Sequence, residues 1–332
     1  MNLKKLTVIA ALFAGLGLLS GCSSGAKQPA VPEKTTYKVG IVQLVQHEAL
    51  DAANKGFVDG LAANGFKEGD NLVIDRQNGQ GSLADLQAIT QRFVNNKVNL
   101  ICAIATPAAQ TAASATRDIP IVGTAITDYK SAKLVKEDAH PGTNVTGTTD
   151  LNPMDKQLEL LLKLVPRAKT IGIIYNASEI NSATQAKAMR VQALSRKLQV
   201  KEVTIASIND LPLLAESLTD GKVDAVYVPT DNTLASAMPA LIHITNEAGI
   251  PVICGEGGMV KNGALATVGI DYYKLGMQTG AMAARILKGE AKPQTMPIEM
   301  QKDMKYTINE REAELLEIQI PEELKKQADM IK

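Results

Sequence analysis

The feature that most constrains the fold is a regular alternation of short apolar runs with longer amphipathic segments from Tyr37 onward. Each short run has the length and composition of a buried strand. The longer segments have helical periodicity: in the first, Leu50, Phe57 and Leu61 fall on one helical face. Strands that alternate with helices form βαβ units and parallel sheets. The predicted strands are residues 37–44, 71–77, 98–105, 119–123, 170–176, 200–205, 224–230, 251–255 and 264–270.

The alternation runs in two series of about five strands, with predicted helices that include residues 107–117, 153–164, 182–198, 211–218 and 232–248. This pattern predicts an α/β protein with two doubly wound parallel-sheet lobes. A single (β/α)8 barrel is the competing arrangement. Against the barrel, residues 144–152 (NVTGTTDLN) are polar and nearly uncharged. Such a stretch is typical of a chain that crosses between lobes.

The composition excludes several classes of protein. The 332 residues carry 35 Lys plus Arg and 35 Asp plus Glu, and 45% are hydrophobic. Without a basic surplus the chain is not expected to bind nucleic acid, and its apolar content is too high for disorder. It has 7 Tyr, 4 Phe and no Trp, so aliphatic residues must build the core, which suits layered α/β packing.

The first 22 residues read as a targeting segment. A short basic start precedes the apolar run 6–19, which is too short for a membrane-spanning helix but fits a secretory signal. Leu19-Ser20-Gly21-Cys22 resembles the lipobox of bacterial lipoproteins. We therefore expect a signal peptide at 1–21, an acylated (palmitate-bearing) Cys22, and a flexible tether over 22–36. The expected location is the extracytoplasmic face of the cell membrane; an uncleaved anchor is the alternative.

Polar residues gather where the predicted strands end. In doubly wound sheets, ligands bind beyond the carboxyl ends of the strands. Glu256 belongs to a Gly-Glu-Gly-Gly run that lacks the frame of a nucleotide-binding loop. The predicted ligand-binding residues are Gln46, His47, Thr106, Thr127, Asp128, Asn181, Ser182, Thr230, Asp231, Asn232, Glu256 and Asp271.

Two of these residues suggest opposite charges on a ligand. Thr106 precedes Pro107, so it is predicted as a helix N-cap whose hydroxyl and neighbouring N–H groups could hold a carboxylate. Asp231, at the mouth of an apolar strand, needs a cation or hydrogen-bond donors beside it. A ligand ammonium would serve, and so would the backbone N–H groups of its own helix.

No catalytic constellation accompanies these residues. From Tyr37 onward the chain contains no GxSxG, HExxH or CxxC motif, so we predict no catalytic residue, no metal site and no cofactor. Cys102 and Cys254 each lie inside an apolar run and are expected to be buried free thiols rather than a disulfide.

Several segments together resemble a known family. The lipobox, KVGIVQLVQHEALDAANKGFVDGL, TAITDY, VPTDNT and GIDYYKLGMQTGAMAARILKGE are similar to ABC transporter substrate-binding proteins of the tryptophan and aromatic amino-acid group. The resemblance implies the type I periplasmic-binding fold, with two lobes joined by a three-strand hinge. It places lobe 1 at 37–148 plus 271–296 and lobe 2 at 149–270 plus 297–332. His47-Glu48-Ala49 and Ser178-Glu179 depart from the usual pattern of the family.

The resemblance also implies a function. The expected protein is a monomeric, lipid-anchored solute-binding protein that delivers an aromatic or branched apolar amino acid to an ABC permease. A ligand-sensing ectodomain that uses the same cleft is the first alternative. A secreted α/β enzyme is the second, and the missing nucleophile and metal motifs argue against it.

Overall fold

The computed structural model describes residues 35–332. The predicted signal peptide, Cys22 and nearly all of the tether therefore lie outside the described residues. From Thr36 onward the chain forms one compact unit. Within residues 35–332, no helix combines the length and the hydropathy needed to cross a bilayer.

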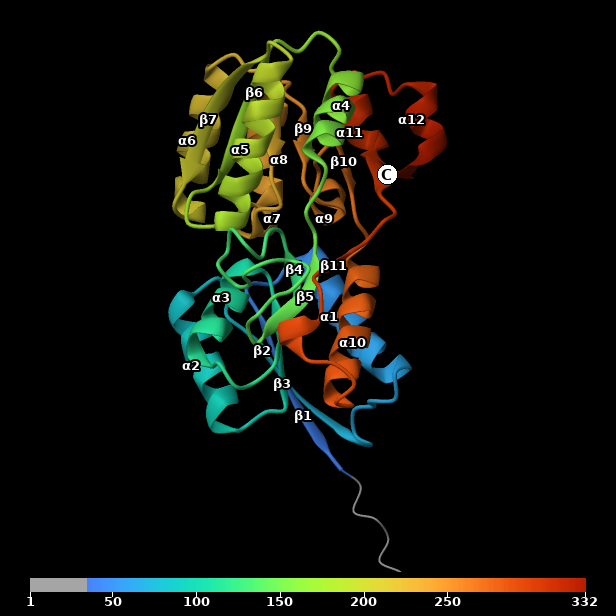
Figure 1. Ribbon diagram of the computed structural model, residues 1–332. Coiled ribbons are helices and arrows are strands. Elements are labelled where there is room, and N and C mark those ends of the chain that lie inside the picture. The colour runs from blue at the N-terminus through green and yellow to red at the C-terminus, as the bar shows by residue number, and fades with distance from the viewer. Residues whose placement is uncertain (1–34) are drawn as a thin grey trace, which may run out of the picture. The chain divides into compact units, whose positions relative to one another are not determined.

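Lobe 1 is built on a six-stranded sheet in the order β11-β5-β4-β3-β1-β2. All of its strand pairs are parallel. Helices α2 and α3 pack together on one face of the sheet, and α1 and α10 pack together on the other (Figure 1). The elements are β1 (Tyr37–Gln43), α1 (Glu48–Ala63), β2 (Leu72–Asn78), α2 (Leu83–Asn95), β3 (Leu100–Ile104), α3 (Thr106–Ala115), β4 (Ile121–Ile126), β5 (Val145–Thr149), α10 (Tyr272–Leu287), the 3-10 turn η2 (Pro293–Thr295) and β11 (Glu299–Met300).

Lobe 2 is built on a seven-stranded sheet in the order β13-β12-β10-β9-β8-β6-β7. Two separate apolar clusters cover its two faces, one with α4 and α5 and the other with α6 and α8 (Figure 1). The elements are α4 (Met154–Leu164), β6 (Thr170–Asn176), α5 (Ile180–Ser195), β7 (Gln199–Ile205), η1 (Ile208–Asp210), α6 (Leu211–Asp220), β8 (Ala225–Val228), α7 (Asn232–Ser236), α8 (Met238–Glu247), β9 (Val252–Cys254), α9 (Gly257–Lys261), β10 (Ala266–Gly269), β12 (Lys305–Asn309), α11 (Glu310–Leu315), α12 (Glu322–Gln327) and β13 (Ala328–Ile331).

Two open sheets exclude the barrel and confirm the predicted fold class. The predicted strands and helices agree with the observed ones to within about three residues, with three exceptions. Residues 144–152 were predicted as a crossing between lobes, but Val145–Thr149 form strand β5, which pairs with β4 inside the first sheet. Strand β12 runs antiparallel to β10, so the second sheet is not wholly parallel. The helix predicted over 232–248 divides at Ala237 into α7 and α8. Pro239 is the physical reason, because its ring nitrogen cannot donate inside a helix but fits the first turn of a new one.

Three segments connect the lobes: residues 150–153, 270–271 and 301–304. The lobe boundaries fall slightly later than the resemblance implied. Glu299 and Met300 pair with Thr148 and Thr149 in the first sheet. Lobe 1 therefore runs to Thr149 in its first part and to Met300 in its second.

Helices α1 and α10 touch backbone to backbone through glycines. A Cβ atom on Gly56 would lie 2.1 Å from the Tyr273 carbonyl oxygen, and one on Gly276 would lie 2.1 Å from the Ala53 oxygen. No side chain fits at that separation, so only glycine allows the contact. The contact holds the start of α10, which follows a crossing segment, beside the middle of α1.

Cys102 lies in the first sheet and Cys254 in the second, and both are buried and free. This confirms the prediction of two buried thiols. Burial raises the pKa of both thiols well above the usual value, so neither is set up as a thiolate nucleophile.

Candidate functional site

The carboxyl ends of both sheets meet around a small enclosed cavity of about 10 Å³. That volume corresponds to roughly one water molecule. Lobe 1, lobe 2 and the crossing segments all contribute to the wall. The lining residues are His47, Leu50, Ala125, Thr127, Asp150, Asn181, Thr230, Asp231, Asn232, Ala235, Glu256, Met259 and Tyr272.

Hydrogen bonds join the two lobes across this cavity. The Thr127 hydroxyl lies 3.3 Å from that of Thr230, and the Gln185 side chain donates to Thr127 over 3.1 Å. On the outer side, Lys261 of α9 forms an ion pair with Glu48 of α1. The lobes are therefore in contact, and the cavity is narrow because they are closed on it.

On lobe 2, buried carboxylates cap the helices that start at the cavity. Asp231 accepts from the Leu234 N–H over 2.8 Å and from the Asn176 N–H over 2.6 Å. Glu256 accepts from Gly258 N–H over 2.5 Å and from Met259 N–H over 3.0 Å. Of the two partners that the sequence left open for Asp231, the N–H groups of its own helix are present.

Burial dominates the electrostatics of both capping residues. It raises the pKa of Asp231 to about 7, with a further contribution from the charge of Glu179. Burial likewise raises the pKa of Glu256 to about 7 despite its two backbone donors. A cation in the cavity would stabilise the charged form of both carboxyls.

On lobe 1, α1 starts at the cavity and α3 starts at the neighbouring strand end, and neither helix has a side-chain cap. Helix α1 follows His47 and α3 follows Ala105, and neither residue forms a capping hydrogen bond. The prediction that Thr106 is the N-cap of α3 is therefore wrong. Ala105 holds the N-cap position, and Thr106 is the first helical residue. Its hydroxyl is buried and has no partner within the described residues.

The backbone at these strand ends is strained. Ala105 has a φ of +83° and Ala125 has a φ of +56°. Residues with a Cβ atom rarely adopt such values. Such strain collects at functional sites. Ala125 itself lines the cavity.

Asp150 is a site residue that the sequence analysis missed. It lies in a crossing segment and is almost fully buried. The hydroxyls of Thr127 and Tyr272 donate to its two oxygens over 2.9 and 2.7 Å. Burial raises its pKa. Asp150 directly follows strand β5, but the sequence analysis interpreted residues 144–152 only as a crossing between lobes, so no predicted strand end indicated it.

Two acceptor atoms on the cavity wall lack partners. The Asn232 side-chain N–H group donates to the Glu179 carboxylate. The Asn232 Oδ1 atom therefore faces His47 and lies 3.2 Å from His47 Nε2. His47 must then donate through Nε2, which leaves Nδ1 as a buried acceptor without a partner. Burial lowers the pKa of His47, which keeps the ring neutral. Asn181 Oδ1 is likewise buried and unpaired.

Five predicted residues do not line the cavity, and Thr106, described above, is one of them. Gln46 is exposed, Asp128 caps a turn through Ser131 and Lys130, and Asp271 caps α10. Ser182 is buried in the first turn of α5, beside Asn181. Among residues 35–332, no group of His, Cys, Asp and Glu is arranged to hold a metal ion.

Residues 38–332 match the model of a family described as ABC transporter substrate binding protein. The chain is 42% identical over 322 residues to a tyrosine-binding protein of Clostridioides difficile, covering 95% of this chain and 93% of the other. A Streptococcus pneumonia domain solved in complex with L-Trp is 40% identical and superimposes with a TM-score of 0.86, over 90% of this chain and 100% of that one.

A ligand-free, open structure of a substrate binding protein with adhesive properties from Clostridium difficile is 45% identical, with a TM-score of 0.70 over 90% and 99% of the two chains. The lower score, despite the higher identity, agrees with a closed arrangement of the lobes in the present structure. The fold is the type I periplasmic-binding fold. This chain belongs to the ABC transporter substrate-binding protein family, whose members bind solutes and are not enzymes.

Proposed function

We propose that this protein is the solute-binding component of an ABC importer and that the cavity binds an aromatic amino acid, with tyrosine and tryptophan as the leading ligands. The observation that carries the proposal is the distribution of charge and unpaired acceptors around the cavity. Its wall includes three carboxyl groups and no lysine or arginine. The tyrosine-binding relative and the L-Trp complex support the choice of ligand class.

The ammonium of the ligand is assigned to the acceptor-rich wall. An ammonium has three N–H donors, and His47 Nδ1 and Asn181 Oδ1 are buried acceptors without partners. Asp150 supplies the counter-charge, because its donors are hydroxyls and no helix depends on it for a cap. Asp231 and Glu256 already accept hydrogen bonds from backbone N–H groups. They therefore stabilise the ammonium mainly through their negative charge, without a direct hydrogen bond.

The carboxylate of the ligand is assigned to lobe 1. The uncapped starts of α1 and α3 present backbone N–H groups, and a helix start favours an anion. The unpaired Thr106 hydroxyl gives the same end of α3 one more donor. Leu50, Ala125, Ala235 and Met259 form the apolar part of the wall and would contact the side chain.

Binding is coupled to closure of the lobes. In the closed arrangement the cavity is too small to admit an amino acid, so the lobes must separate for the ligand to enter. A ligand whose two charges contact opposite lobes favours the closed form, and a permease can distinguish that form from the open one.

A panel titration tests the ligand. L-Tyr, L-Trp, L-Phe and L-Leu are titrated calorimetrically into the purified protein, with 3-(4-hydroxyphenyl)propionate as the matched compound that lacks the ammonium. We expect an aromatic amino acid to bind with a Kd in roughly the micromolar range or tighter, about 8 kcal/mol, and the des-amino compound to bind far more weakly. No thermal stabilisation by any of the twenty amino acids would overturn the proposal.

The anchor is a separate part of the proposal, based on the Leu19-Ser20-Gly21-Cys22 sequence. We propose that Cys22 is acylated and holds a monomeric binding protein at the extracytoplasmic face of the membrane. Cys22→Ala is then expected to move the protein from the membrane fraction to the soluble fraction. Recovery of an uncleaved, membrane-bound variant would instead indicate a plain anchor.

A further inference from the structure

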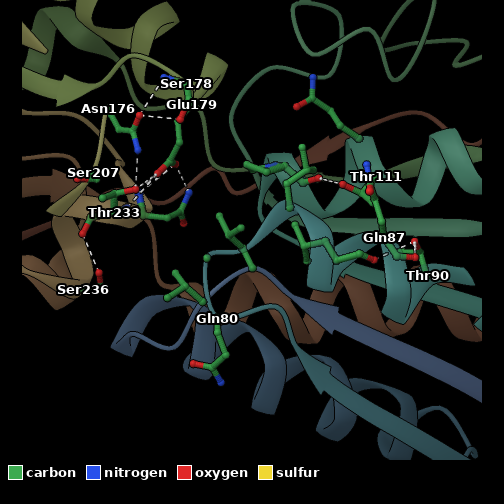
Figure 2. Close-up of a pocket in the computed structure, with 18 of the residues that line it drawn as sticks. Gln80, Gln87, Thr90, Thr111, Asn176, Ser178, Glu179, Ser207, Thr233 and Ser236 are labelled. Carbon is green, nitrogen blue, oxygen red and sulfur yellow. Dashed lines mark hydrogen bonds between the residues drawn. The ribbon is translucent and has the colours of Figure 1, made fainter. Parts of the chain in front are cut away.

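A second, larger space lies at the mouth of the cleft, on the side away from the crossing segments. This mouth groove has a volume of about 870 Å³ and lies between α2 and α3 of lobe 1 and α7 and η1 of lobe 2. Figure 2 shows its two walls, with Gln87 and Thr111 on one side and Ser178, Ser207 and Thr233 on the other.

The walls of the mouth groove combine polar and apolar side chains and are nearly uncharged. Lobe 1 contributes amide side chains, including Gln80, Gln87 and Gln110. Glu179 is the one charged residue among the lining residues, and its oxygens accept hydrogen bonds from Asn232 and Thr233. This chemistry suits a neutral ligand segment that carries hydrogen-bond donors and acceptors, as a peptide bond does.

Apolar side chains supplement the amides from both lobes. Leu83 is 60% exposed and Ile208 is 46% exposed, and both line the mouth groove. They offer contacts to a side chain of varied size, which is a second property expected of a peptide subsite.

The mouth groove and the cavity lie on either side of a shared residue, and the geometry indicates the direction of a ligand that spans both when the lobes are apart. Asn232 lines the two spaces. Asp150 and Tyr272 lie at the end of the cavity nearest the crossing segments, whereas Pro107, in the first turn of α3, lines the mouth groove. An amine held near Asp150 therefore directs the carboxyl carbon of the same residue toward the mouth groove.

From these observations we infer that the protein also binds short peptides, with an aromatic N-terminal residue in the cavity and the second residue in the mouth groove. The inference rests on the proposed function, because it uses the same ammonium site.

The direct test compares three compounds by calorimetric titration of the purified full chain: L-Tyr, the dipeptide Tyr-Ala and N-acetyl-L-Tyr. We expect Tyr-Ala to bind within about tenfold of L-Tyr, because its ammonium is retained and its carboxyl side is extended. N-acetyl-L-Tyr should bind at least 100-fold more weakly, because its extension replaces the ammonium. Mass spectrometry of the bound fraction verifies that the dipeptide is intact.

Two substitutions at one position locate the second residue. Gln87 is exposed on α2, so Gln87→Ala and Gln87→Trp leave the helix intact. Alanine removes the amide, and tryptophan fills the space and adds the only indole as a fluorescence reporter. Both variants should weaken Tyr-Ala at least fivefold and leave L-Tyr within twofold. Gln327→Ala, on exposed α12 of lobe 2, is the matched control and should change neither affinity.

The outcomes separate the two ideas. If L-Tyr binds and Tyr-Ala does not, the peptide inference is wrong and the amino-acid function stands. If Tyr-Ala binds but neither Gln87 variant affects it, or if N-acetyl-L-Tyr binds equally well, the assignment to the mouth groove is wrong. If no compound binds, the proposed function itself fails.

Discussion

The two lobes present opposite chemistry to the same cavity, although both place helix starts there. On lobe 2, α7 and α9 begin under the carboxylates of Asp231 and Glu256. On lobe 1, α1 and α3 begin without any side-chain cap. A capped helix start has used its N–H groups on its own protein, whereas an uncapped one can still bind an anion. The difference shows that a helix start at a strand end is not by itself a binding site. Whether the helix start is capped by a carboxylate decides whether that position favours a cationic or an anionic group of the ligand.

The largest effect is expected from Asp150→Asn. The substitution keeps the shape of the side chain but removes the proposed counter-charge of the ligand ammonium. Binding of L-Tyr should weaken by about 2–5 kcal/mol, measured by calorimetric titration. Asp128→Asn, at a turn outside the cavity, is the control. If Asp150→Asn binds L-Tyr with wild-type affinity, Asp231 or Glu256 of lobe 2 must supply the counter-charge of the ammonium instead.

The second prediction concerns pH. Asp231 and Glu256 have pKa values raised to about 7 in the folded protein, whereas unfolded carboxyls titrate near pH 4. Between these values the folded state holds protons that the unfolded state has lost, so stability falls as the pH rises toward 7. The limit is about 1.4 kcal/mol per pH unit for each group. The lowered pKa of His47 opposes the decline below about pH 6.5.

Denaturant unfolding at pH 5, 6 and 7, with and without L-Tyr, measures this decline. A bound ammonium should flatten the curve, because it favours the charged carboxyls. Glu256→Gln should flatten it without ligand. If the wild-type curve in the absence of ligand is already flat, the lobe 2 carboxyls are charged throughout and the contrast between the lobes is smaller than proposed.

Asp231→Asn tests the capping side of the comparison. An asparagine at this position can accept from only one of the two N–H groups that Asp231 now satisfies. We expect the free energy of unfolding to fall by about 1–2 kcal/mol. L-Tyr affinity should fall less than in Asp150→Asn. An equal or larger loss of affinity would make Asp231 the main partner of the ammonium, as the sequence suggested.

Thr106→Val tests the uncapped side and carries the smallest effect. The hydroxyl has no protein partner, so its removal should leave stability unchanged or slightly higher. Ligand affinity should fall by about 1 kcal/mol if the hydroxyl donates to the ligand carboxylate. Thr111→Val, on the same helix, is the control, because the Thr111 hydroxyl donates to the Pro107 carbonyl. A stability loss with unchanged affinity at position 106 would remove Thr106 from the site.

Much of the architecture was predictable because it depends on local periodicity. Strands such as β6, predicted at 170–176 and observed at Thr170–Asn176, follow from apolar runs between helical patterns. The residues at the strand ends were also predictable as a group, since a doubly wound sheet brings its carboxyl ends to one edge. Seven of the twelve predicted ligand-binding residues line the cavity: His47, Thr127, Asn181, Thr230, Asp231, Asn232 and Glu256. Thr106 does not line it and is the first residue of helix α3.

The roles of these residues were decided only by the tertiary structure. Asp231 and Asp150 are both aspartates beside a strand end in the sequence, yet one caps a helix and the other accepts two hydroxyl bonds between the lobes. Tyr272 donates to Asp150 from the first residue of α10, a helix that glycines allow to lie against α1. A sequence therefore determines which polar groups arrive at the cleft. Which of them keep spare hydrogen-bonding capacity depends on contacts between residues more than 100 positions apart, and no local pattern records those contacts.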